Sequence, residues 1–459
     1  MLATLDSFLP RSCSTHSPAR SQDAFAGQCE LSRRIQMMPT SEPGREARQG
    51  WIAFLCFCTV LLGIEIATNG YSRALNSDEA QYYAPAIDFV SKSLPHLSLR
   101  DYPFPGPPLA LWAQACVNTL FGGLWSVRIF STACAVALGG YFLLRAESAR
   151  RLPAIGILAI LTFPFFLWNA FTIKQHTFTV ACLLVGLEQW CRAEEERSDR
   201  GLKLAGVFLT AAALSNQFCA PLCAALCVDG LWCGRKRSGA EIGRVVAVAV
   251  PLVCLGLLML VWGGKQPPAY VDPLPAEIST DWRGHLAQFV LGAISVGAWI
   301  GVLGFEFRTH VRVLGMALAP SLLLVWLSRL YAPSGSFWTT GQGPVSTVLS
   351  VFSHRAPWLA IGLGAVLMAL AVCIWVSPGL HAPWNGRFRM LVAGYLGTTA
   401  LAVPYLFESY YLLLVLPLLF LVLRYHETLL PMKLRAAVPL GAMVCAGIGY
   451  AIFKLKQPS

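Results

Sequence analysis

The sequence is poor in charged residues. Only 13% of its 459 residues are charged and 56% are hydrophobic, whereas a soluble domain carries about 25% charged residues. Apolar runs long enough to cross ~30 Å of hydrocarbon recur along the chain. This composition excludes an ordinary soluble domain. It predicts an all-α polytopic membrane protein, because helices satisfy their own backbone polar groups in lipid.

Several motifs of enzymes and metal sites are also missing. There is no GxxxxGK[ST] phosphate loop, no HExxH zinc motif and no GxSxG nucleophile elbow. The 15 cysteines lie mostly inside apolar runs, which is typical of small buried thiols. We therefore expect no cofactor and no structural metal. The sequence leaves open whether a divalent cation assists the function.

The basic residues are distributed as topology signals. The net charge is +11, but the basic residues fall in short clusters between apolar runs, which is how membrane orientation is encoded. We therefore expect membrane lipid as a partner and no nucleic acid. Residues 1–48 are rich in Ser, Arg, Pro and Gln without apolar periodicity, which predicts a disordered tail. Residues 49–459 are expected to form a single transmembrane domain.

About thirteen transmembrane helices are predicted. The segments are 51–70, 125–145, 152–170, 177–193, 203–216, 218–234, 243–263, 286–304, 313–331, 357–376, 390–405, 408–424 and 435–453. The apolar run within residues 107–122 is short for a membrane crossing. We interpret them as a juxtamembrane helix in the interface, with Trp112 as an anchor.

The positive-inside rule supports this choice. If residues 107–122 do not cross, the basic tail and most later basic clusters share one side, with Lys454 and Lys456 as mild exceptions. If they do cross, the tail disagrees with the later loops. The sequence therefore predicts a multi-pass protein of the cell membrane with a cytoplasmic N-terminus. Its first extracytoplasmic loop is expected at 71–124.

That loop contains the most informative stretch of the chain, Asn76-Ser-Asp-Glu-Ala-Gln-Tyr-Tyr83. Asp78 at the membrane surface is a candidate base, because a carboxylate can deprotonate an attacking hydroxyl or amine. The alternative is that Asp78 and Glu79 cap a short loop helix. The same parity places the polar loops 168–176, 263–285 and 331–355 and the turn 404–410 on this face.

Cations on this face are candidates for holding a phosphate leaving group. They are Arg100, Lys174, Lys265 and Arg355. The alternative for each is an interfacial side chain that extends to the headgroups. A base together with phosphate-binding cations would serve transfer of a sugar from a lipid-linked phosphate to an acceptor.

The sequence resembles the integral-membrane glycosyltransferases of the C-type superfamily, and within it the protein O-mannosyltransferase and aminoarabinose-transferase branch. Four stretches carry the resemblance. They are Ser77-Asp-Glu-Ala-Gln-Tyr82 after the first span, Tyr102-Pro-Phe-Pro-Gly-Pro-Pro-Leu109 leading to Phe121-Gly122, Trp125-Ser-Val-Arg-Ile129, and Phe407-Glu-Ser-Tyr-Tyr-Leu412. The resemblance is best over about 60–195 and recurs near 405–420.

The resemblance implies a hexosyl- or pentosyltransferase that uses a polyprenyl-phosphate sugar and an acceptor of unknown kind. It implies that Asp78 is the catalytic base and that Glu79 supports it or the local fold. The residues predicted to bind substrate are Tyr82, Arg100, Lys174, His176, Arg355, Glu408 and Tyr410. In two places the chain departs from the family pattern: His176 stands where an Asp is expected, and Ser409 where many members have Arg.

Two other functions stay open from the sequence. A transporter or lipid flippase would place functional charges in the middle of the membrane, whereas Glu65, Glu188 and Asp229 sit near the ends of predicted spans. An inactive glycosyltransferase-like protein retained for binding would explain the departures at His176 and Ser409. Of the three functions, only transfer requires release of polyprenyl phosphate from a donor.

Overall fold

The computed structural model describes most of the chain. The described residues are 43–76, 78–93, 98–145, 152–196, 198–233, 239–264, 266–270, 282–304, 306–328, 343–380, 384–402, 411–425 and 433–456. The chain divides into two compact units, Met1–Gln49 and Gly50–Ser459. The tail predicted at 1–48 lies almost wholly outside the described residues. In the described part the structure is helical, without a β-strand.

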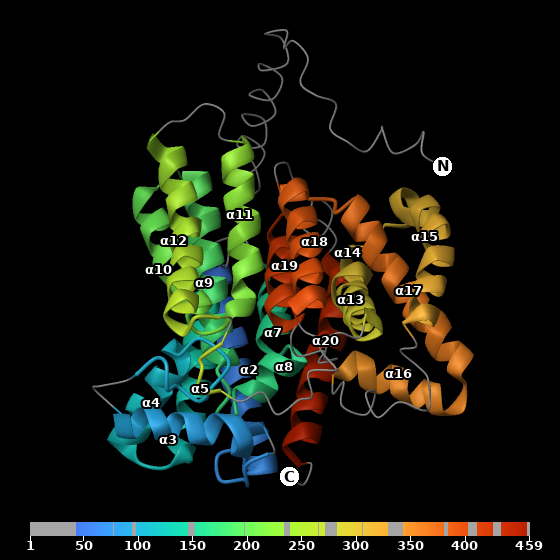
Figure 1. Cartoon of the computed structure of the whole chain (residues 1–459). Helices are drawn as coiled ribbons and strands as arrows, with labels where there is room; N and C mark the ends of the chain where they lie inside the picture. Colours follow the sequence, from blue (N-terminus) through green and yellow to red (C-terminus); the bar gives the residue numbers. More distant parts are fainter. Residues whose placement is uncertain are drawn as a thin grey trace. The chain divides into compact units, whose positions relative to one another are not determined.

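The helices follow the apolar runs of the sequence (Figure 1). They are α2 (Pro43–Thr68), the π-helix η2 (Glu79–Tyr83), α3 (Ala84–Ser93), α4 (Leu109–Phe121), α5 (Leu124–Leu143), α7 (Ala154–Leu161), α8 (Pro164–Asn169), α9 (His176–Glu196), α10 (Asp199–Ala213), η3 (Gln217–Cys219), α11 (Ala220–Cys233), α12 (Gly239–Trp262), α13 (Trp282–Val296), η5 (Gly297–Gly301), α14 (Val302–Gly304), α15 (Phe307–Leu327), α16 (Pro344–Arg355), α17 (Pro357–Val376), α18 (Trp384–Ala402), α19 (Leu412–Tyr425) and α20 (Lys433–Lys456).

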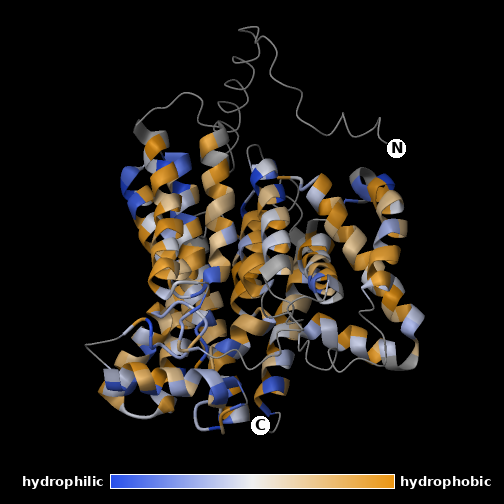
Figure 2. Ribbon diagram, in the orientation of Figure 1, coloured by the Kyte–Doolittle hydropathy of each residue, from blue (hydrophilic) through white to orange (hydrophobic). Residues whose placement is uncertain are grey.

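Among the described residues, seven helices are long and apolar enough to cross a membrane. These segments are Ala47–Thr68, Leu124–Leu143, Ile242–Trp262, Gly284–Gly301, His310–Leu327, Pro357–Val376 and Ala437–Lys456. Figure 2 shows the long helices mainly in the hydrophobic colour, with hydrophilic residues gathered near helix ends. A polytopic membrane protein is therefore supported. The count of thirteen crossings stays a prediction.

The helices pack in two groups joined through α18 and α19. On one side α9 packs on α10, α10 on α12 and α12 on α11, while on the other α17 packs on α13, α15 and α16. Ion pairs made by buried arginines join α9 to the central helices. Arg424 of α19 pairs with Glu188 and with Glu195 at 3.0 Å, and Arg387 of α18 pairs with Glu194. Because charges in an apolar interior must be paired, these contacts fix α9 against α18 and α19.

The segment 152–170 differs from the single span that we expect from the sequence. It forms two short helices, α7 and α8, that are separated at Thr162 and Phe163. Pro164 explains the break, because proline disfavours helical geometry in the preceding residue, and Phe163 is extended with ψ 134°. A Cβ on Gly447 of α20 would lie 1.6 Å from the Thr162 carbonyl oxygen. Only glycine permits this close approach, which seats α20 on α7 and α8.

The predicted juxtamembrane segment 107–122 contains α4, which packs against α3. Figure 1 shows α3 lying across the direction of the long helices. A second core cluster holds both helices against the end of α12, where Trp262 donates a hydrogen bond to the Leu99 carbonyl at 2.9 Å. The helix α16 lies within the stretch 331–355, which the sequence indicates only as a polar loop.

Candidate active site

The site begins with a helix start just before the two acids. The Asn76 side chain accepts a hydrogen bond from the Glu79 amide at 2.9 Å, and the Glu79 carboxylate accepts one from the Asn76 amide at 3.0 Å. This exchange is a capping box, in which the first and fourth residues satisfy each other's amides. The Asp78 side chain makes no capping hydrogen bond. Of the two acids, only Glu79 therefore fits the capping alternative.

Glu79 is fully buried and is the centre of a network that joins three parts of the chain. Its carboxylate accepts from Arg73 at 2.7 Å, from Arg128 of α5 at 3.3 Å and from the Ile173 amide at 3.0 Å. Arg128 also donates to the carbonyls of Tyr71 at 3.0 Å and Arg73 at 2.7 Å. Glu79 thus connects the first loop to α5 and to the loop before α9, and its surroundings are those of a structural anchor.

The loop before α9 is held by neighbouring helices. Thr132 of α5 donates to the Ala170 carbonyl at 2.6 Å, and Gln114 of α4 donates to the Lys174 carbonyl at 3.4 Å. The Lys174 side chain is almost completely buried, and its ammonium lies 4.7 Å from the centre of the Trp168 ring. Such a cation over an aromatic face is electrostatically favourable. The backbone and the side chain of Lys174 are therefore both fixed.

Lys174 reaches the predicted base. Its Nζ lies 2.6 Å from Oδ2 of Asp78, although the two residues are 96 positions apart in sequence. The Asp78 side chain is 51% exposed and that of Lys174 only 9% exposed. An exposed carboxylate thus meets a cation that projects from the protein interior. This arrangement leaves the carboxylate accessible from outside the protein, and the ammonium lies beside it.

A third charged group joins this pair from the end of the chain. Lys454, half-buried near the end of α20, interacts electrostatically with both Lys174 and Asp78. The packing of Gly447 and Tyr450 on α7 and α8 brings this end of α20 to the site. Sequence reasoning missed this residue, because it treats Lys454 only as an exception to the topology rule. Its position opposite the basic clusters was the available signal.

His176 begins α9 two residues after Lys174. Burial, with a smaller contribution from the Lys174 charge, lowers the pKa of His176 to about 3, although the Asp78 charge acts in the opposite direction. Its Nδ1 is buried without a hydrogen-bond partner among the described residues. A buried polar atom without a partner is costly. The structure thus places a neutral imidazole, whose Nδ1 has no partner in the described part of the chain, near Asp78 and Lys174.

The acid sensitivity of the fold should depend on His176. Its pKa is near 6.5 in an unfolded chain and lower in the folded one, so protonation favours the unfolded chain. The contribution of His176 to the free energy of unfolding is therefore complete above about pH 6.5 and is lost as the pH falls toward 3. We expect the unfolding midpoint of His176→Gln to fall less between pH 7 and pH 4 than that of the unmodified protein. Thermal unfolding across this pH range measures the difference. Parallel curves would contradict the assigned pKa.

Two of the other predicted residues have further described contacts, and the remaining side chains lie outside the described part. Tyr82 packs against the second core cluster. Arg100 is exposed, and its carbonyl accepts from the Ala269 amide at 3.3 Å. The predicted Lys265, Glu408, Ser409 and Tyr410, together with the Arg355 side chain, lie outside what the structure describes. In the described residues, no group of three or more His, Cys, Asp or Glu side chains could hold a metal ion.

Comparison with known proteins gave one match. Residues 105–262 match the family described as dolichyl-phosphate-mannose-protein mannosyltransferase. The match confirms the resemblance to C-type membrane glycosyltransferases and supports glycosyltransferase activity in a multi-pass membrane protein. The matched range contains Arg128, Lys174 and His176 and begins after Asp78 and Glu79. Searches of curated proteins and of solved structures found no match.

Proposed function

We propose that the chain transfers a sugar from a polyprenyl-phosphate donor to an acceptor at the extracytoplasmic face of the membrane, with Asp78 as general base. The observation that carries the proposal is the pair of the exposed Asp78 carboxylate and the buried Lys174 ammonium, with Lys454 beside them. A base next to two cations fits a reaction in which the acceptor loses a proton to the base and a phosphate leaves beside the cations.

In the proposed step, the acceptor oxygen or nitrogen loses its proton to Asp78 as it bonds to the anomeric carbon. The bond from that carbon to the phosphate oxygen breaks, and the polyprenyl phosphate leaves with the electron pair. Lys174 and Lys454 would bind the leaving phosphate, because charge-assisted hydrogen bonds are among the strongest polar contacts. Attack from the side opposite the phosphate would invert the anomeric centre.

The donor phosphate would also change the state of the base. The Lys174 Nζ pairs with the Asp78 carboxylate at 2.6 Å. A phosphate that attracts Lys174 would weaken this ion pair and leave the carboxylate to accept a proton. The neutral His176 imidazole would then hydrogen-bond the acceptor or the phosphate through Nδ1. Binding of donor would thereby prepare the site for the acceptor.

The direct test follows the labelled lipid. Purified protein in nanodiscs is mixed with a labelled polyprenyl-phosphate sugar and candidate acceptors, and free polyprenyl phosphate is measured together with the sugar-bearing product. Acceptor-dependent release of polyprenyl phosphate is expected. A transporter would move the lipid without cleaving it, and an inactive binding protein would retain it.

The two lysines should contribute differently to donor use. Lys174→Met is expected to lower kcat/KM for the donor by about 10–100-fold, because one charge-assisted contact contributes about 1.5–3 kcal/mol. Lys454→Met should act in the same direction with a smaller effect, since Lys174 makes the direct contact with Asp78. Initial rates at varied donor concentration measure both variants.

Lys92→Met provides the matched control. Lys92 lies on α3 of the same loop, is exposed and pairs with Asp88 at 2.6 Å. Its replacement removes a positive charge of similar kind without touching the cluster around Asp78. Wild-type kinetics in Lys174→Met and Lys454→Met, or an equal loss in Lys92→Met, would refute the assignment of the two lysines to the phosphate.

A further inference from the structure

A cavity of about 630 Å³ lies between α5, α9 and α10, and its lining contains none of Asp78, Lys174 and His176. Its volume falls in the range of pockets that hold small molecules, about 300–1,000 Å³. One part is apolar, with Cys134, Phe178, Cys182 and Phe208 among its lining residues. The cavity thus offers space that water fills poorly and a hydrocarbon chain fills well.

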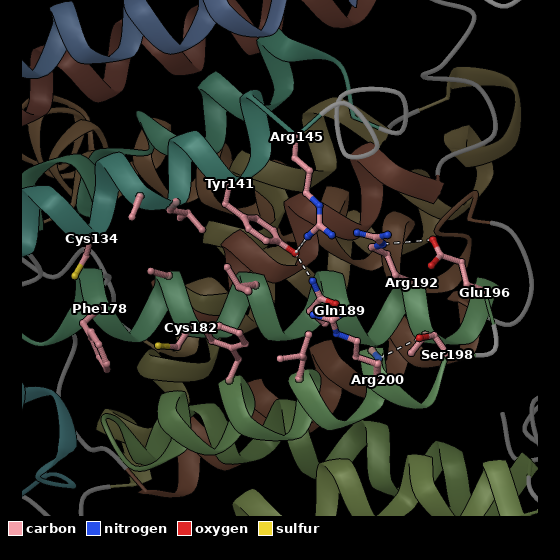
Figure 3. Close-up of a pocket in the computed structure, with 18 residues that line it drawn as sticks. Cys134, Tyr141, Arg145, Phe178, Cys182, Gln189, Arg192, Glu196, Ser198 and Arg200 are labelled. Atoms are coloured by element: carbon pink, nitrogen blue, oxygen red, sulfur yellow. Dashed lines mark hydrogen bonds and ion pairs between the residues drawn. The ribbon is translucent and has the colours of Figure 1, made fainter. Parts of the chain in front are cut away.

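The other end of the cavity is basic. Arg145, Arg192 and Arg200 line it, together with the Ser198 hydroxyl and one acid, Glu196, which pairs with Arg192 at 3.4 Å. Figure 3 shows the three arginines gathered at the end opposite to Cys134 and Phe178. With three cations and one carboxylate, this end carries an excess of two positive charges.

The basic end is far from the Asp78 site along the same helix. Arg192 lies about 24 Å from His176 along α9, at 1.5 Å rise per residue. That distance approaches the ~30 Å thickness of the hydrocarbon layer. The apolar part of the cavity lies between His176 and the basic end. Val207, next to Phe208 on α10, is 64% exposed, as expected for a surface that meets lipid.

We propose that this cavity binds one anionic phospholipid of the membrane leaflet opposite to Asp78. The acyl chain lies between α5, α9 and α10, and the phosphate is bound by Arg145, Arg192 and Arg200. The charge of the headgroup complements the excess of two positive charges, and guanidinium groups bind phosphate oxygens in pairs. Basic pockets between helices suit lipid headgroups. This inference does not depend on the transfer reaction.

Native mass spectrometry tests the proposal on the whole protein. Protein from nanodiscs with phosphatidylcholine alone, or with added phosphatidylglycerol, is examined for retained lipid. We expect one retained phosphatidylglycerol per chain. The double variant Arg145→Gln/Arg200→Gln should weaken retention about tenfold or more through loss of two charge-assisted contacts. The control Lys203→Gln/Arg389→Gln removes two exposed cations that do not line the cavity.

A second variant tests the apolar part without changing any charge. Ala137→Trp places a large side chain at a cavity residue that is exposed at the protein surface, so the fold should accept it. Loss of phosphatidylglycerol in this variant supports a lipid chain inside the cavity. The proposal is overturned if Ala137→Trp retains the lipid, or if both double variants lose it equally. It is also overturned if polyprenyl phosphate displaces phosphatidylglycerol at equal concentration.

Discussion

Asp78→Asn is expected to reduce sugar transfer by about 10²–10⁴-fold, the usual contribution of a positioned base. The amide is nearly the same size as the carboxylate but cannot accept the acceptor's proton. The described contact of the Asp78 side chain is its ion pair with Lys174, and this side chain is 51% exposed. The variant should therefore insert and fold. The release rate of labelled polyprenyl phosphate and the thermal unfolding midpoint measure the two effects separately.

The control for this prediction is Asp88→Asn. Asp88 lies on α3 in the same loop, and its carboxylate is 59% exposed and paired with a lysine, as Asp78 is. The Asp88→Asn variant should keep full activity, because nothing in the described structure connects Asp88 to the cluster around Lys174. Undiminished transfer by Asp78→Asn would remove Asp78 from the role of base. A loss of folded protein in that variant would show instead that the carboxylate supports the structure.

The expectation about Asp78 depends on a contact that the sequence predicts only in part. The parity of the apolar runs places Asp78 and Lys174 on the same face of the membrane, and the structure brings them to 2.6 Å. The sequence could not give this distance, because it depends on how α5, α8 and α9 pack. The same parity places the end of the last span on this face, so Lys454 could have been added to the candidates.

Two local signals carry information that the apolar runs do not. Asn76 followed three residues later by Glu79 is a capping-box signal, and it separates the roles of two adjacent acids. The apolar run 152–170, in contrast, gives no indication of two helices unless Pro164 is weighed against it. The number of crossings depends on helix tilt and on neighbouring helices, which hydropathy does not specify.

Glu79→Gln is expected to destabilise the protein by about 3–5 kcal/mol, the effect of breaking a buried ion pair by removing one partner. Glu79 is 0% exposed. Its replacement leaves the guanidinium groups of Arg73 and Arg128 without their carboxylate. The loop should loosen and activity should fall with it. Thermal unfolding in nanodiscs measures the loss. Glu65→Gln is the matched control: Glu65 accepts from the Tyr71 amide at 3.1 Å, and because the Gln oxygen can accept the same bond, this change should cost less.

A double-mutant cycle distinguishes this anchoring role from a part in the chemistry. If Glu79 and Arg128 stabilise each other, Glu79→Gln combined with Arg128→Met should cost less than the sum of the single changes. Additive costs would contradict the coupling, and a Glu79→Gln protein with normal stability but no transfer would make Glu79 a catalytic residue. The two adjacent acids are therefore expected to separate: Asp78→Asn removes activity and keeps the fold, whereas Glu79→Gln weakens the fold on which Asp78 and Lys174 depend.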